Sequence, residues 1–276
     1  MLHAISTHLF VNHRLTTVWL DRIWEAGIPL VEIFCARQHL DYRNPAQLTE
    51  LGHWFRDSEL KMHSLHAPMY NDDCWGRTGP SAVINIAEPE KIRRIASVDE
   101  IKRAIDLVEF VPYRYLIQHV GVSGEEYSDE RVEAAFRSLD ELRVFASHRG
   151  VEILLENTPN SLASAERLLF IMQQTHLNLN FCLDTGHAHM NEGVAEAFAM
   201  MAAQIRSTHV HDNDGKADSH LFPLHAPEGT INWKETMSLF RPRAGQFPLL
   251  LELREVPEME NPLKVVRDVF RKLESA

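Results

Sequence analysis

Three features of the sequence predict an α/β fold, a single (β/α)8 TIM barrel that spans residues 1–276. Short apolar runs of strand length alternate with longer amphipathic stretches from end to end. Eight such pairs follow one another without a linker or a break in composition. The length of 276 residues is usual for one barrel, and the 45% hydrophobic content is enough for a large core. A closed barrel therefore fits better than its main alternative, a doubly wound open sheet.

The expected strands are hydrophobic on both faces, as buried parallel strands are. They are Leu2–Ser6, Leu30–Phe34, Lys61–His66, Tyr115–His119, Val151–Glu156, Leu179–Asp184, Ser207–His211 and Leu249–Leu253. Polar starts, apolar spacing and glycine or proline stops predict helices between them. These helices are Thr16–Ala26, Val98–Val111, Asp129–Arg149, Ser164–Thr175 and Asn261–Leu273. Two long connections, Met69–Arg93 and Asn213–Thr230, are where we expect lids or binding residues.

Composition and charge narrow the class of protein. The net charge of −11 lacks the basic footprint of a protein that grips a phosphate backbone, which makes nucleic acid an improbable partner without excluding it. The three cysteines have no CxxC spacing and are expected to be reduced thiols. The start of the sequence has no basic segment and no long apolar run, so we expect no signal peptide, and no apolar run approaches the roughly 20 residues of a membrane span. We expect a cytoplasmic protein without membrane contact.

Acidic residues and histidines recur at the C-terminal ends of six successive strands, the third to the eighth. They are His66, His119, Glu156, Asp184, His209 and Glu252. Each alone is usually an ordinary hydrogen-bonding or solvated residue, but in a closed barrel all of them converge on the axis. Several carboxylates buried together require cations. Because carboxylates with imidazoles suit Zn²⁺, Mn²⁺, Fe²⁺ or Co²⁺, the pattern predicts one to three divalent ions at the C-terminal face.

Three motifs make the pattern more specific: Glu156-Asn157-Thr158, Asp184-Thr185-Gly186-His187 and the stretch EGTINW at 228–233. With them, essentially the whole chain resembles the xylose-isomerase-like barrel superfamily. That superfamily includes sugar isomerases and epimerases and the endonuclease IV group, AP endonuclease family 2. The resemblance implies a core metal site of Glu156, Asp184, His209 and Glu252. Endonuclease-like members carry more ligands, and the matching residues are His66 and His119 for one further metal and His187, Asp218 and His220 for a third.

Four further residues are candidate substrate contacts. Trp75 could stack on a sugar face, although a loop tryptophan is about as often a packing residue. Arg37, after the second strand, could contact a phosphate or equally be a solvated loop residue. Glu32 lies at the end of the second strand and could line the pocket. His211 follows the strand-seven ligand His209 by two residues. Strand alternation could point it outward, so we expect it behind the metal ligands.

Two enzymatic functions and one binding function fit these residues. The first is a metal-dependent isomerase or epimerase of a sugar, polyol or related keto compound. Glu156 and Glu252 would form its acid/base pair, and His187 would steady the developing oxyanion. The second is an endonuclease-like phosphoester hydrolase, which the nine-residue ligand set favours and the acidic charge disfavours. The third is a non-catalytic metal- or ligand-binding barrel, against which the intact acid/base candidates argue.

One departure from the family pattern bears on this choice. Ketose epimerases of the superfamily usually hold their substrate with an arginine six residues after the strand-seven histidine, and here that position is Gly215. A standard ketose-epimerase assignment therefore does not follow. We favour the first function in its broader form, with a small sugar-like molecule as substrate; a homo-oligomer is compatible with the sequence.

Overall fold

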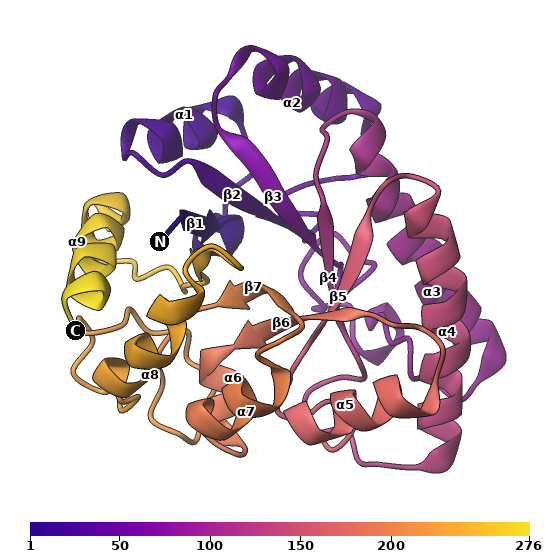
Figure 1. The fold of residues 1–276 in the computed structure, drawn as a ribbon. Helices are drawn as coiled ribbons and strands as arrows, with labels where there is room; N and C mark the ends of the chain where they lie inside the picture. Colours follow the sequence, from indigo (N-terminus) through magenta and orange to yellow (C-terminus); the bar gives the residue numbers. More distant parts are fainter.

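The computed structural model describes all residues, 1–276, and its eight strands form one parallel sheet in the order β7-β6-β5-β4-β3-β2-β1-β8. The strands are β1 (His3–Ser6), β2 (Leu30–Phe34), β3 (Lys61–His66), β4 (Tyr115–His119), β5 (Glu152–Glu156), β6 (Asn180–Asp184), β7 (Ile205–His209) and β8 (Leu249–Leu251). A parallel bridge between Val210 and Leu251 joins the two edges of the sheet. The barrel predicted from the sequence is therefore confirmed, with helices around its outside (Figure 1).

Nine α-helices cover the barrel. They are α1 (Thr17–Glu25), α2 (Pro45–Asp57), α3 (Lys91–Ile105), α4 (Asp129–Ser147), α5 (Ala165–Gln174), α6 (Thr185–Met190), α7 (Val194–Met201), α8 (Trp233–Phe240) and α9 (Pro262–Ser275). Four of the five predicted helices agree with α1, α4, α5 and α9 to within two residues. None of the helices combines the length and the apolar character that crossing a membrane requires.

The predicted helix Val98–Val111 is wrong in its bounds, because α3 begins at Lys91 and gives way to a 3-10 turn at Asp106–Glu109. The reason lies at its start: the Glu90 side chain accepts hydrogen bonds from the backbone amides of Ile92 and Arg93 and so caps the helix. The long connection after β3 is correspondingly shorter than the sequence suggested.

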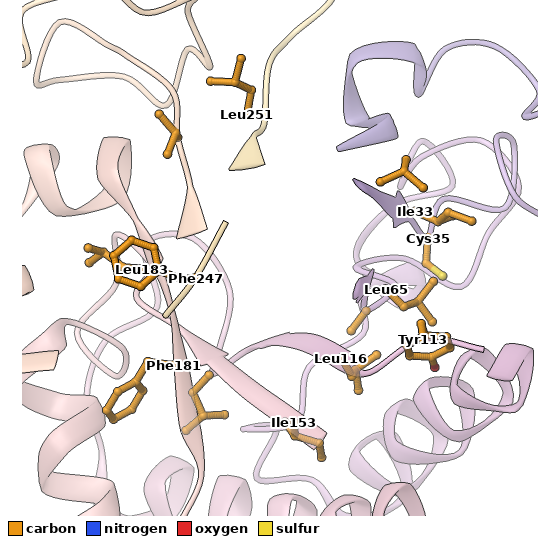
Figure 2. Close-up of a cluster of buried hydrophobic side chains, with 14 of the residues drawn as sticks. Ile33, Cys35, Leu65, Tyr113, Leu116, Ile153, Phe181, Leu183, Phe247 and Leu251 are labelled. Atoms are coloured by element: carbon orange, nitrogen blue, oxygen red, sulfur yellow. The ribbon is translucent and has the colours of Figure 1, made fainter. Parts of the chain in front are cut away.

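Alternation along the strands decides which residues reach the barrel axis. Leu116, Ile153 and Phe181 belong to the main hydrophobic core, part of which Figure 2 shows. The intervening residues Ile117 and Cys182 belong to a separate small cluster together with Tyr115 and Leu154. That second row, continued by two residues on β4, β5 and β6, ends in His119, Glu156 and Asp184. The pleat of the strands thus aims these three side chains at a common point.

Candidate metal centre

Four residues at the C-terminal ends of β5 to β8 form what we call the inner group. Its members are Glu156, Asp184, His209 and Glu252, and their ligand atoms lie within 4.8 Å of one another. Nδ1 of His209 is the centre: it lies 3.0 Å from Oε1 of Glu156, 3.3 Å from Oε2 of Glu252 and 3.9 Å from Oδ2 of Asp184. Since all four side chains are at most 3% exposed, three carboxylates meet here with almost no water to screen them.

The middle group consists of His66, His119 and Glu156, whose ligand atoms also converge. Oε2 of Glu156 lies 3.0 Å from Nε2 of His119 and 3.6 Å from Nε2 of His66. Nδ1 of His66 is 2.8 Å from the carbonyl oxygen of Ala67, so it carries a proton, and Nε2 is the nitrogen that faces the carboxylate. Because Oε1 of Glu156 faces His209, this one carboxylate bridges the inner and middle groups.

The outer group consists of His187, His211, Asp218 and His220. Oδ2 of Asp218 lies 3.3 Å from Nε2 of His187 and 3.3 Å from Nε2 of His220. Each of these rings uses its Nδ1 on a backbone carbonyl, of Asn157 at 2.9 Å and of Glu252 at 3.1 Å respectively. Both imidazoles therefore present the same nitrogen to one carboxylate, the arrangement that a shared ion needs.

His211 does not point outward, as the sequence had suggested. It is fully buried, and its Nε2 lies 3.0 Å from the carboxylate of Asp184 and 3.8 Å from Oδ1 of Asp218. A Cβ at Gly186 would come within 2.0 Å of the His211 ring, so glycine is required at that point of α6. His211 therefore lies between the inner and the outer group, against a carboxylate of each.

The long loop after β7 is held by Asp212. Its Oδ1 accepts the backbone amides of Thr230 and Ile231 at 3.0 and 3.1 Å, and its Oδ2 accepts Nε1 of Trp233. A Cβ on Gly229 would lie 2.5 Å from Cγ of Asp212, so this close approach also requires glycine. The 228–233 motif thus anchors the loop that carries two members of the outer group.

Charge in the outer group is balanced between imidazoles and carboxylates. Burial raises the pKa of Asp218, but its hydrogen bonds to His187 and His220 outweigh this and hold the pKa well below its usual range. Burial lowers the pKa of His220, but Asp218 raises it to about 8. In the absence of a metal, protonated histidines therefore supply the positive charge that the carboxylates need.

The residues also fit a divalent ion. Oδ1 of Asp218 and Oε1 of Glu252 are buried without a hydrogen-bond partner. Such atoms are rare in folded proteins and are expected where a cation completes their surroundings. Together with the mixed imidazole and carboxylate donors, this suits Zn²⁺, Mn²⁺, Fe²⁺ or Co²⁺.

The other residues expected near the substrate fall at different places. Trp75 packs 5.2 Å from the Phe34 ring, which in turn lies 4.3 Å from the His66 ring, so Trp75 borders the middle group. Arg37 donates to the carbonyl oxygen of Asn71 at 2.9 Å and so braces the loop after β3. Glu32 is fully buried against the inner group, with Oε1 3.0 Å from Nε2 of His209.

A cavity of about 260 Å³ lies beside the middle group. Its lining comes from the ends of β3 and β4 and the loops that follow them: His66, Ala67, Pro68, Met69, Tyr70, Val83, Ile84, Gln118, His119, Gly121, Val122 and Ser123. The cavity offers room for a small molecule next to two candidate ligands.

His8 also lies near the outer group, although the sequence did not indicate it. It lies on the 3-10 turn Thr7–Phe10 after β1, with its ring 4.7 Å from that of His220. Its Nδ1 is 3.1 Å from the carbonyl oxygen of Leu253, and burial lowers its pKa well below the usual value. Its place near the end of the first strand was the signal in the sequence, but His8 lies two residues beyond the expected strand end, Ser6.

A sequence profile of the xylose isomerase-like TIM barrel family matches residues 20–275. An uncharacterized protein of Methanocaldococcus jannaschii is 28% identical over 225 residues, which make up 79% of this chain and 80% of that protein.

Solved structures with the same fold cover nearly the whole chain. A D-tagatose 3-epimerase-like protein is 23% identical with a TM-score of 0.76, over 100% of this chain and 99% of its own. The 3-keto-D-glucoside 4-epimerase of E. coli is 17% identical with a TM-score of 0.74, over 100% of both chains. The IOLI protein, crystallised with a zinc atom, is 18% identical with a TM-score of 0.73, over 100% of this chain and 98% of its own.

Proposed function

The chain belongs to the xylose isomerase-like TIM barrel family, and we propose that it is a divalent-metal-dependent isomerase or epimerase of a sugar, a polyol or a related keto compound. The observation that carries the proposal is the inner group, in which two glutamates, Glu156 and Glu252, flank one histidine nitrogen. The names of two similar structures, a D-tagatose 3-epimerase-like protein and a 3-keto-D-glucoside 4-epimerase, support this class of reaction.

The inner group has the parts that proton transfer beside a carbonyl requires. A bound divalent ion would polarise the carbonyl of the substrate and make a neighbouring proton easier to remove. Oxygens of Glu156 and Glu252 lie 3.0 and 3.3 Å from Nδ1 of His209, so both carboxylates border the place where the ion would lie. Either could take the proton of the substrate while the other returns one. His119 and His66 on Oε2 of Glu156 hold that carboxylate in place.

His187 is the candidate for stabilising the developing negative oxygen. Burial lowers its pKa, but Asp184 and Asp218 raise it well above the usual value. The ring therefore keeps its second proton at neutral pH in the metal-free outer group. Its positive charge, 3.4 Å from Oε1 of Glu156, would stabilise a negative oxygen that develops beside that carboxylate.

Size and charge support a small substrate. The cavity beside His66 and His119 has a volume of about 260 Å³, and the protein carries a net charge of −11. A duplex would need a basic surface, and Arg37, the arginine considered for a phosphate, is bonded to Asn71. Trp75, packed on Phe34, is an aromatic residue near the middle group on which a sugar face could stack.

A second function is favoured by one specific observation, the position of the outer group beside the inner group. His187 bridges them, with Nδ1 3.6 Å from Asp184 and Nε2 3.3 Å from Asp218. Clustered metal ions stabilise both the attacking and the leaving oxygen in phosphoester displacement. An endonuclease-like phosphoester hydrolase is therefore the alternative that the experiment must separate.

The experiment supplies Mn²⁺, Co²⁺ and Zn²⁺ in turn and tests ketoses, polyols and an abasic oligonucleotide. We expect turnover of a ketose or polyol, and a loss of at least ~10²-fold in Glu156→Gln. The matched control is Glu59→Gln, since Glu59 is exposed and lies just before the start of β3, at the opposite end of the barrel. Activity confined to the oligonucleotide would overturn the isomerase in favour of the hydrolase, and full activity of Glu156→Gln would remove Glu156 from the reaction.

A further inference from the structure

The two ring nitrogens of His209 face different carboxylates. Nδ1 lies 3.0 Å from Glu156 and 3.3 Å from Glu252, within the inner group. Nε2 lies on the other edge of the ring and contacts Glu32, at 3.2 Å from Oε2 and 3.0 Å from Oε1. Both side chains of this second contact are 0% exposed, so no water can take the place of either partner.

Glu32 is itself oriented by the neighbouring strand. The register of β2 and β3 places it opposite Ser64, whose hydroxyl donates to Oε2 of Glu32 at 2.7 Å. Glu32 belongs to none of the groups whose ligand atoms converge. Its Oε1 has no hydrogen-bond partner, although it lies close to the same histidine nitrogen. The contacts of this carboxylate are therefore with His209 and Ser64.

The neighbours of the two nitrogens determine where the His209 ring carries hydrogen. A neutral imidazole has one N–H and one lone pair, and a carboxylate can only accept. Nδ1 and Nε2 both face carboxylates, so the ring can hold a proton on each nitrogen while no ion is bound. An ion at the inner group would take the lone pair of Nδ1, and the one remaining hydrogen would then lie on Nε2, which faces Glu32 alone. Nδ1 is the nitrogen at the centre of the inner group, where a metal would need it.

We infer that Glu32 is a positioning residue that fixes His209 as its Nε2–H tautomer and reserves Nδ1 for the metal. This role differs from the substrate contact that the sequence suggested for Glu32. A carboxylate behind a metal-binding histidine orients the ring and raises its basicity, and its loss typically costs 10- to 100-fold in metal affinity. The inference rests on the metal centre of the proposed function, although not on the reaction.

The experiment measures zinc affinity of the full chain by competition with a chelator, together with zinc ions per chain. Glu32→Leu should lose roughly 10- to 100-fold in affinity. Glu32→Gln keeps an oxygen that can accept from Nε2, so it should retain most of the affinity. The matched control is Glu100→Gln. Glu100 is also buried, but its carboxylate binds Tyr42 and Arg43, neither of which is a candidate ligand. The zinc affinity of this variant should equal that of the parent.

Two results would overturn the inference: parental affinity in Glu32→Leu, or a loss in Glu32→Gln as large as that in Glu32→Leu, which would make charge and not the acceptor decisive. If Glu32→Leu does not fold, ¹⁵N NMR of the zinc-loaded parent decides, with His209 assigned by its absence in His209→Ala. A protonated Nε2 supports the inference, and zinc on Nε2 contradicts it. Parental zinc binding without turnover of any sugar would end the proposed function and leave this inference intact.

Discussion

The inner and outer groups of the centre are built in different ways. The inner group sits at strand ends that neighbouring strands hold by backbone hydrogen bonds, and its side chains are almost fully buried. The outer group takes His187 from α6 and its other three members from the chain after β7, and the Asp218 side chain is 36% exposed. The comparison teaches that the barrel itself sets the inner geometry, while the outer geometry depends on how one loop is anchored. We therefore expect the inner group to carry the reaction.

The largest expected effect comes from making the same chemical change in each group. Glu252→Gln removes an acid/base candidate of the inner group and should lower turnover by ~10²- to 10⁴-fold. Asp218→Asn in the outer group should lower it by less than about tenfold, because the proposed proton transfer does not pass through Asp218. Steady-state kinetics on the substrate that the parent converts checks both. Equal losses of turnover in the two variants would show that both groups take part in the reaction and would favour the multi-metal hydrolase.

A smaller effect is expected from loosening the loop alone. Gly229→Ala places a methyl group 2.5 Å from Cγ of Asp212, which anchors the loop. The variant should lose the ion of the outer group, keep that of the inner group and be destabilised by about 1–3 kcal/mol. Metal content per chain and urea unfolding measure the two effects. Gly245→Ala is the control, since a Cβ there meets no atom within 4 Å; an unchanged metal content in Gly229→Ala would show that the anchor is dispensable.

The difference between the strand ends and the loop also explains which features the sequence could predict. The barrel and the ends of strands such as β5 and β6 follow from apolar runs, so Glu156 and Asp184 could be placed at the axis by alternation alone. The position of His211 could not, because β7 ends at His209 and the chain beyond it follows the anchor at Asp212. The start of α3 was missed because its cap is a glutamate, a less usual capping residue.

Contacts that depend on distant packing were also beyond the sequence. Arg37 reaches a backbone carbonyl at Asn71, and no local pattern indicates such a partner. Glu32 could be placed at a strand end, but its contact with His209 joins residues 177 positions apart. Such contacts arise only when the barrel closes.

The smallest expected effect is a pH dependence confined to the outer group. Burial lowers the pKa of His220, but Asp218 raises it to about 8, and a metal binds only the neutral ring. The pKa of His187, in the same group, is also raised. Affinity for the outer ion should therefore rise by at least about tenfold per pH unit up to about pH 8 and less steeply above it. In the metal-free protein the sign reverses: the ion pair with Asp218 stabilises the fold below about pH 6.5 and its contribution is lost as the pH rises through 8. Titrations with zinc from pH 6 to 9 measure this dependence, and a flat profile would contradict it.

The most direct test of the central claim is hydrogen exchange during turnover. The metal-loaded protein is incubated in D₂O with a panel of ketoses, and NMR follows the carbon next to the carbonyl. Proton transfer by Glu156 and Glu252 predicts deuterium at that carbon with the parent and none with Glu156→Gln. Absence of exchange in every ketose, with hydrolysis of a phosphodiester by the same preparation, would contradict the account.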